Sequence, residues 1–432
     1  MRIFLFLLLC FFSNDILASN IQNNKECITE HVTIDFNFSG AGNSTCEVIS
    51  SDHIRISVVP ESKESINPSP WYAFRKSKNT KKILVELSYG EYEHRYFPKI
   101  KKTNGNWEKI NERDILIKND GKNVLINLYP SKESQYISSQ ELITEDWYED
   151  WYVTLKENNF LRSKIIGYSV QNRPIKAFFS SENINNPYIF ILGRQHPPEV
   201  SSVFAIKGFV NELIGNINLS EEFLSKYNIF FVPLMNPDGV ENGFWRYNYN
   251  KKDLNRDWDN FFQPETNSVK NFLDNLKNRN QPILYIDFHS TYKNIFYISD
   301  AQLTNSHPNF LLNWLEKSRL ELSKIGYNFS IKESYTKSNK ISKNYFHNKY
   351  NIPSMTYEVS DTEERSKITK SSKILARNLI TILLDPEIYT IYRSAIVPTL
   401  FTDKSSTPKV RASSEKVKSV PLVPSVTFPP RL

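Results

Sequence analysis

His196 and Glu199 are separated by two prolines in the segment 193–199. An apolar run at residues 188–192 precedes this segment, and a helical pattern at residues 200–214 follows it. In open α/β sheets, loops at the carboxyl ends of strands turn side chains toward a common crevice. An imidazole and a carboxylate on such a loop could bind one metal ion, although a lone pair of this kind is more often a surface or capping pair. A metal site therefore requires a third ligand elsewhere in the chain.

His289 meets that requirement. It directly follows the apolar, strand-like run 284–288 and precedes Ser290. Two imidazoles and one carboxylate leave the fourth position of a tetrahedral Zn²⁺ open for water, which is typical of a catalytic site rather than a closed structural site. The sequence thus predicts one Zn²⁺ ion bound by His196, Glu199 and His289.

Glu358 is the candidate general base. Zinc lowers the pKa of bound water and polarises a carbonyl, but hydrolysis still needs a group that accepts a proton from that water. Glu358 lies in the apolar, strand-like segment 355–359, where burial of a carboxylate is unfavourable unless a function requires it. The alternative is a strand residue that faces solvent.

Two further segments could bind the carboxylate of a substrate. Arg246 follows Trp245, and Asn255 stands beside Arg256 in the segment 253–258. A guanidinium binds a carboxylate through its planar pair of N–H groups, and an amide adds a further N–H. Each arginine taken singly is more often a surface residue.

Taken together, these residues resemble the zinc metallocarboxypeptidases in their order and spacing. The resemblance covers roughly residues 160–385 and rests on His196-x-x-Glu199, Asn236-Pro237-Asp238-Gly239, Trp245-Arg246, Asn255-Arg256, His289-Ser290 and Glu358. It implies a hydrolase that acts on the C-terminal peptide bond of peptides or proteins through a promoted-water mechanism.

The resemblance also implies roles for individual residues. Asn255 and Arg256 would hold the terminal carboxylate of the substrate, and Arg246 would stabilise the oxyanion. Asp253 would be the carboxylate that orients His196. Tyr335 resembles the mobile tyrosine that covers bound substrate, with Tyr345 and Tyr350 as nearby alternatives.

Substrate preference is predicted from the same resemblance. In this family, a residue that falls near Ser342 and Lys343 lines the pocket for the terminal side chain. A lysine there favours an acidic terminal residue, and Lys337 and Lys340 lie close in sequence. The alternative is that these lysines are simply exposed.

The elements that must position this site form two regions. Residues 20–135 contain short alternating runs separated by turn-forming residues, which predict a small all-β sandwich. Segments 70–75 and 96–98 within it resemble the β domain that precedes the catalytic domain in cytosolic-type carboxypeptidases and their bacterial relatives. The digestive branch lacks that domain and usually has arginine where Pro198 stands here.

In residues 136–392, strand-like runs alternate with helical patterns. This arrangement predicts an α/β catalytic domain with a mixed central sheet flanked by helices. A final helix is expected over residues 371–384. Residues 393–432 are rich in Ser, Lys and Pro and are expected to form a disordered basic tail.

The N-terminal residues predict export. Residues 1–19 combine Arg2, an apolar run and the small residues Ala18 and Ser19, as a signal peptide does. The apolar run is much shorter than the ~20 residues of a spanning helix, which disfavours the alternative of a membrane anchor. The expected location is secreted or periplasmic. In an oxidising compartment, Cys27 and Cys46 either form a disulfide or remain separate buried thiols.

The charge of the chain disfavours nucleic-acid binding. The net charge of +7 is spread along the chain rather than clustered, so a solvated surface is favoured over nucleic-acid binding. Two alternatives to a carboxypeptidase remain open at this point: a zinc amidase that acts on peptidoglycan stem peptides, and an inactive binding protein. The sequence does not decide the oligomeric state.

Overall fold

The computed structural model describes residues 25–64, 68–102, 105–180, 186–215, 217–276, 280–299 and 309–390. The expected signal peptide and C-terminal tail lie outside these residues. Among the residues described, no helix has both the length and the apolar character that crossing a membrane requires.

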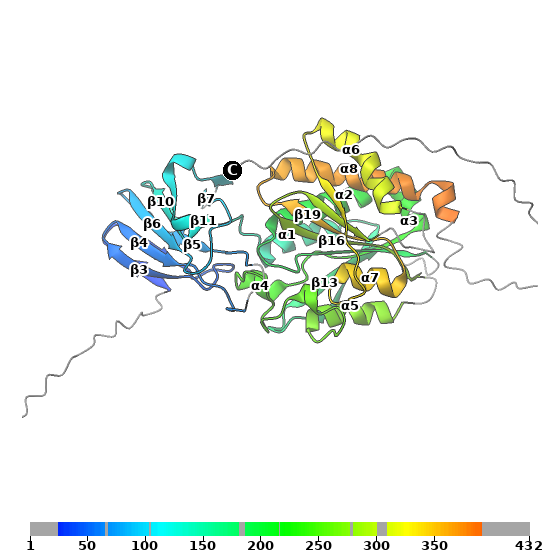
Figure 1. Cartoon of the computed structure of the whole chain (residues 1–432), viewed down its shortest axis with the longest axis horizontal. Helices are drawn as coiled ribbons and strands as arrows, with labels where there is room; N and C mark the ends of the chain where they lie inside the picture. Colours follow the sequence, from blue (N-terminus) through cyan, green and yellow to red (C-terminus); the bar gives the residue numbers. More distant parts are fainter. Residues whose placement is uncertain are drawn as a thin grey trace, which may run out of the picture. The chain divides into compact units, whose positions relative to one another are not determined.

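The N-terminal region is all-β, as predicted, and its described strands form two sheets (Figure 1). The first has the order β1 (Glu26–Ile28), β2 (Thr33–Asp35), β5 (Ala73–Lys76), β11 (Gln135–Ser138), β7 (Lys99–Lys102) and β8 (Trp107–Lys109). The second has the order β3 (Thr45–Ser50), β4 (His53–Ser57), β6 (Ile83–Ser88), β10 (Asn123–Leu128) and β9 (Ile115–Lys118). Short 3-10 turns at Glu112–Asp114 and Asn119–Gly121 flank β9.

The inner faces of the two sheets share a core. Alternate residues of β6 and β10 are buried because successive strand side chains point to opposite faces. Val85 and Ile126 from one sheet and Phe74 from the other belong to the same apolar cluster and are fully buried. A disulfide between Cys27 of β1 and Cys46 of β3 links the two sheets. The pairing that the sequence left open is therefore present.

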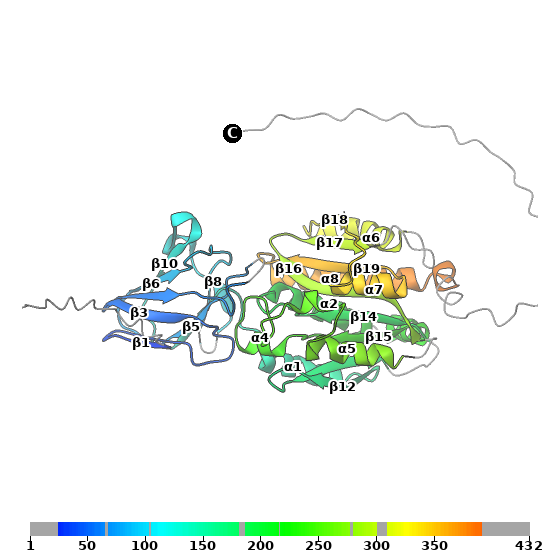
Figure 2. The same cartoon turned by 60° about the horizontal axis from the view of Figure 1, so that its bottom comes forward.

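The region after β11 contains one mixed sheet, which confirms the predicted α/β class. Its order in the described residues is β12 (Leu161–Tyr168), β13 (Pro174–Ser180), β15 (Asn228–Val232), β14 (Tyr188–Gly193), β16 (Pro282–Thr291), β19 (Ser354–Ser360), β17 (Ile295–Ser299) and β18 (Ser330–Glu333). The central strands β15, β14, β16 and β19 are parallel, and antiparallel pairings join them to the outer strands (Figure 2). The carboxyl ends of the central strands therefore meet at one edge.

Helices cover both faces of this sheet (Figure 1). One face packs against α1 (Glu145–Lys156), α2 (Val200–Gly215), α3 (Ile217–Lys226), α6 (Phe310–Lys324) and α8 (Arg365–Leu383). The other packs against α5 (Pro264–Asp274) and α7 (Ser342–Tyr350). Consecutive residues of β14 alternate between the two cores, since Ile189 and Ile191 belong to the first and Phe190 to the second. The alternation of side chains along a strand thus determines which of the two cores each residue of β14 enters.

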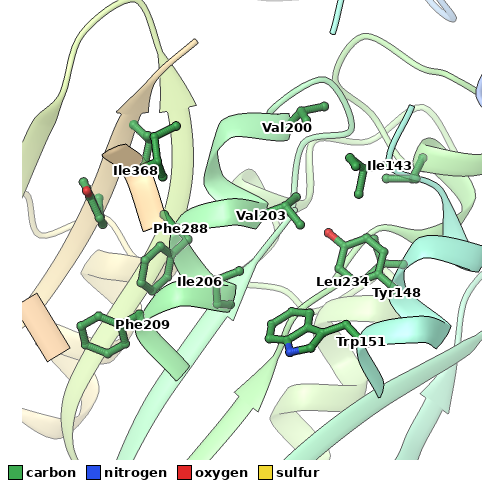
Figure 3. Close-up of a cluster of buried hydrophobic side chains, with 14 of the residues drawn as sticks. Ile143, Tyr148, Trp151, Val200, Val203, Ile206, Phe209, Leu234, Phe288 and Ile368 are labelled. Carbon is green, nitrogen blue, oxygen red and sulfur yellow. The ribbon is translucent and has the colours of Figure 1, made fainter. Parts of the chain in front are cut away.

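Helix α2 is central to the first core. Most of its residues are buried because α2 lies between the sheet and α8. Val203, Ile206 and Phe209 of α2 lie in one cluster with Phe288 of β16 and Trp151 of α1 (Figure 3). Each such side chain contributes about 1.5–3 kcal/mol when fully buried. This packing anchors the residue before α2, which is Glu199.

Two boundaries differ from the sequence-based expectation. The expected domain boundary after residue 135 falls inside β11, which is part of the first N-terminal sheet. The last helix begins at Arg365 rather than at residue 371. Its first turn lacks apolar periodicity, and a charged contact holds it instead, because Arg365 Nε and Nη2 donate to the Glu141 carboxylate at 3.0 and 2.8 Å.

Candidate metal centre and active-site cavity

The loop after β14 carries His196 and Glu199 in a constrained backbone. Arg194 has a φ of +56°, a left-handed conformation that is uncommon for a residue other than glycine. Its buried guanidinium donates from Nε to the Pro197 carbonyl at 2.7 Å. Gly239 in α4 (Pro237–Glu241) packs so closely that a Cβ there would lie 2.5 Å from Pro197 Cγ. The Asn-Pro-Asp-Gly segment thus supports the loop.

The three predicted zinc ligands lie together. His196 Nδ1 lies 2.8 Å from Glu199 Oε1, and His289 Nδ1 lies 2.8 Å from Glu199 Oε2. One nitrogen or oxygen atom from each residue lies within 4.8 Å of the others. All three side chains are buried. The loop before α2 and the end of β16 therefore place two imidazoles and a carboxylate around one point.

Each imidazole also contacts a carboxylate of its own, in addition to Glu199. His196 Nε2 lies 3.0 Å from Asp253 Oδ1, and His289 Nε2 lies 2.9 Å from Asp287 Oδ2. A carboxylate at Nε2 favours the tautomer with its proton there, which leaves the Nδ1 lone pair directed toward Glu199. This arrangement is typical of histidines that bind a metal.

The electrostatics of the cluster fit a cation. Burial lowers the pKa of His289, but Asp287 and Glu199 outweigh it and raise that pKa well above its ordinary value. Burial also raises the pKa of the Glu199 carboxyl, yet His196 and His289 hold it well below its usual range. The site therefore stabilises positive charge beside an ionised carboxylate. Two imidazoles and one carboxylate are a donor set that suits Zn²⁺.

Glu358 faces this cluster from the neighbouring strand. It lies opposite His289 in the parallel pairing of β16 with β19. Its Oε2 atom is buried and has no hydrogen-bond partner within the described part of the chain. Burial and the nearby Glu199 carboxylate raise the pKa of Glu358 to about 7. A carboxylate in this state can exchange a proton near neutral pH.

Asp253 connects the metal cluster to Arg246. Its Oδ2 accepts from Nε and Nη2 of Arg246 at 2.8 and 2.7 Å, while its Oδ1 faces His196. Burial raises the pKa of Asp253, but His196, Arg246 and Arg256 hold it well below its ordinary range. The ionised carboxylate therefore fixes both side chains at once.

Asn255 and Arg256 lie in the 3-10 turn Leu254–Arg256, beside the metal cluster. Asn255 is buried, accepts a hydrogen bond from the Ser342 backbone N–H at 2.9 Å, and places Nδ2 3.3 Å from His289 Nε2. Arg256 is exposed and donates from Nη1 to the Asn255 carbonyl at 2.7 Å. The turn therefore presents an amide and a guanidinium side by side.

A cavity of about 270 Å³ unites these groups. Its lining includes His196, Glu199, Arg246, Asn255, Arg256, His289, Lys343 and Glu358, together with Ser69 and Arg95 from the N-terminal region. Every site residue predicted from the sequence, apart from Asp253 behind the ligands and Tyr335, thus borders one cavity.

Lys343 contributes a positive charge to the cavity. It lies in the first turn of α7 and is 1% exposed. Its Nζ donates to Ser299 Oγ at 2.6 Å and to the Ser334 carbonyl. Burial lowers the pKa of Lys343 to about 8. Lys337 and Lys340 are exposed and outside the cavity lining, as the alternative for those two lysines predicted.

The structure does not bring Tyr335 to the cavity. The side chain is 42% exposed, and its ring packs against His347 at a centroid distance of 5.1 Å. The alternative Tyr345 is a core residue that packs against Trp258. Tyr297 of β17 lines the cavity instead.

Three residues at or near the site are not predicted from the sequence: Asp287, Arg95 and Glu61. Asp287 is a fully buried carboxylate in an apolar strand, the same feature that singled out Glu358. Arg95 and Glu61 belong to the N-terminal β region and reach the site only through tertiary contacts. No local sequence pattern marks them.

Comparison with known proteins agrees with this geometry. The family model described as zinc carboxypeptidase matches residues 148–381, more than half of the chain. Cytosolic carboxypeptidase 1 of Xenopus laevis is 36% identical over 132 residues, which are 29% of this chain and 11% of that protein. Its Homo sapiens counterpart is 34% identical over 132 residues with the same coverage. The match therefore spans about a tenth of the length of these relatives.

Solved structures share the fold over most of the chain. The metallo-carboxypeptidase of Burkholderia cenocepacia superposes with a TM-score of 0.66 at 17% identity, and covers 81% of this chain and 99% of that one. The metallo-carboxypeptidase of Pseudomonas aeruginosa, in complex with (2-guanidinoethylmercapto)succinic acid, gives a TM-score of 0.65 at 18% identity, with 82% and 99% covered. At these identities the likeness concerns the fold. With the family model matching over the region that carries the ligand cluster, the chain belongs to the zinc carboxypeptidase family.

Proposed function

We propose that this protein is a zinc-dependent metallocarboxypeptidase that hydrolyses the C-terminal peptide bond of peptides or proteins by a promoted-water mechanism. The observation that carries the proposal is the single cavity shared by His196, Glu199, His289, Glu358 and the carboxylate-binding groups. A hydrolytic metal site beside a carboxylate-binding turn suits an exopeptidase, because the terminal carboxylate distinguishes the last peptide bond from all others. One Zn²⁺ ion bound by the three ligands would supply an acidified water and polarise the scissile carbonyl.

The residues of the chain account for the remaining steps. Asn255 and Arg256 hold the terminal carboxylate and thereby place the last peptide bond beside Glu358. Glu358 accepts the proton of the attacking water and returns a proton to the leaving amine. Arg246, which Asp253 holds in place, stabilises the negative charge that develops on the scissile oxygen.

Lys343 supports a preference for an acidic C-terminal residue. Its buried ammonium group borders the cavity near Asn255, whose Oδ1 accepts from the adjacent residue of α7, Ser342. In the described residues, Lys343 bonds the neutral groups Ser299 Oγ and the Ser334 carbonyl. A side-chain carboxylate of the substrate would neutralise this charge in a place where water is scarce.

We also propose that the protein is exported, to the periplasm or outside the cell. The pattern of residues 1–19 supports export, and the disulfide between Cys27 and Cys46 is compatible with an oxidising compartment.

Exchange of Glu358 for glutamine tests the proposed role of this residue. Glu358→Gln keeps the size of the side chain but cannot accept the proton, so turnover should fall roughly a thousandfold or more while zinc content stays unchanged. Release of C-terminal residues and metal content are measured on the same samples. The control Glu364→Gln changes an exposed glutamate that precedes α8. Full activity of Glu358→Gln would refute the proposal.

A further inference from the structure

Arg95 is a residue of the N-terminal β region that borders the active-site cavity. Its side chain is 6% exposed and lies between the rings of Tyr96 and Tyr292, with centroid distances of 4.9 and 4.6 Å. Nε and Nη2 donate to Asp361 Oδ2 at 3.2 and 2.8 Å, and Nη1 donates to Ser69 Oγ at 2.6 Å. A guanidinium has five N–H groups, so these contacts leave donors available at the cavity wall.

Strand β19 sets the order of groups along the cavity. Lys343 Nζ bonds Ser299, which pairs with Ser354 at the start of β19. Glu358 lies further along the strand, and Asp361, the partner of Arg95, follows its end. Because strand residues advance by about 3.3 Å each, Glu358 lies between the end of the cavity that contains Lys343 and the end that contains Arg95.

This order fixes the direction of a bound peptide. Under the proposed function, on which this step rests, the last residue occupies the end with Asn255, Arg256 and Lys343. The scissile bond then lies at Glu358, and the residues on its amino side extend toward Arg95. Ser290 lines the cavity, and its buried hydroxyl has no hydrogen-bond partner among the described residues.

We propose that Arg95 binds the backbone carbonyl that precedes the scissile carbonyl in the substrate chain, so that the N-terminal β region forms part of the substrate-binding site. A carbonyl is favoured over a carboxylate because Asp361 already neutralises the guanidinium. Ser69 and the two aromatic rings hold the guanidinium plane fixed, which reduces the entropy lost on binding.

Two probes that differ by one acetamido group test this assignment. Phenylpropanoyl-glutamate has the scissile amide but no amide before it, whereas acetyl-phenylalanyl-glutamate adds an acetamido group, which supplies the preceding carbonyl together with one N–H. Their affinities are measured with the zinc-loaded full chain carrying Glu358→Gln, so that hydrolysis does not interfere. We expect the longer probe to bind about tenfold more tightly, the gain from a hydrogen bond to a charged donor.

Adding Arg95→Gln should reduce this gain to about twofold or less. Arg95→Gln leaves Asp361 unpaired, so the double variant Arg95→Gln/Asp361→Asn is made as well, and it should lose the gain equally. Arg113→Gln is the control, because Arg113 is an exposed arginine of the same β region, outside the cavity lining. It should keep the gain.

The outcomes separate this inference from the proposed function. No difference between the probes, or a gain that persists in folded Arg95 variants, overturns the role of Arg95 whether or not the parent enzyme hydrolyses peptides. An Arg95-dependent gain supports the role, and if the parent enzyme releases no C-terminal residue, the proposed function alone fails.

Discussion

At the residue level, the proposed specificity depends on one buried side chain, Lys343. An ammonium group in a site closed to water is unfavourable unless a negative charge joins it, which explains why burial lowers its pKa to about 8. Replacing Lys343 by methionine keeps the length of the side chain and removes the charge. We expect Lys343→Met to lower kcat/KM for peptides ending in Glu by about tenfold or more and to change peptides ending in Leu little.

The pH dependence follows from the same group. In the proposed role only protonated Lys343 binds a carboxylate, so the preference for acidic ends should be present below pH 8 and weaken as the pH rises through about 8. Rates are compared on matched peptides ending in Glu and Leu between pH 6 and pH 9. Lys340→Met, at an exposed lysine, is the control. Equal turnover of both peptides by the parent enzyme would exclude this role.

Individual site residues differ in how far the sequence predicts them. His196, Glu199 and Glu358 stand out because each follows or interrupts an apolar strand pattern. Asp287 meets the same criterion as Glu358, because it is also a carboxylate within an apolar strand. Tyr335 was assigned from sequence position alone, and position does not determine which way a loop side chain points.

At the scale of elements, a loop of the β region clamps the segment that carries Arg246. Glu61 is buried, and its carboxylate accepts three consecutive backbone N–H groups, from Trp245 at 2.7 Å, Arg246 at 2.9 Å and Tyr247 at 2.7 Å. A second loop of the β region, at Gly42, also approaches this segment closely. Gly243 has a φ of +63°, and a Cβ there would lie 2.5 Å from the Gly42 nitrogen. The β region thus positions Arg246.

Glu61→Gln tests this positioning role. Glutamine has only one acceptor oxygen. Its amide NH2 group is a donor and would face a backbone N–H of residues 245–247, which is also a donor, so some of the three hydrogen bonds would be lost. Because Arg246 stabilises the transition state under the proposed function, we expect kcat to fall about tenfold or more while KM changes little. The measurement is steady-state kinetics on one peptide. Glu64→Gln, at an exposed glutamate of the same loop, is the control. An unchanged kcat, or a rise in KM alone, would contradict the account.

The strands that the sequence predicts are those with clear patterns. β14 matches the expected run at residues 188–192 because all of its residues are buried and apolar or small, and β6 and β10 show the alternation expected of residues 20–135. β12 was missed, since this outer strand is mostly exposed and has no apolar period. The contacts of Glu61 and Arg95 could not be predicted, because residues far apart in sequence meet only after both regions fold.

At the scale of the whole molecule, the described residues belong to one compact unit. Arg95 and Asp361 form a buried ion pair between the β region and the carboxyl end of β19. Lys99 and Arg365 both form ion pairs with the Glu141 carboxylate. The fold class and order of regions follow from the sequence, while the shared cavity does not. The likeness to solved metallo-carboxypeptidases over 81–82% of the chain includes both regions.

The cluster of His196, Glu199 and His289 is proposed to be the metal site of a carboxypeptidase. Its most direct test measures zinc content and release of single C-terminal residues from a peptide library, before and after removal of metal with a chelator. We expect one zinc per chain, release of terminal residues only, loss of release with the metal, and recovery when Zn²⁺ is added back. Release that persists without metal, or cleavage at internal bonds, would contradict it.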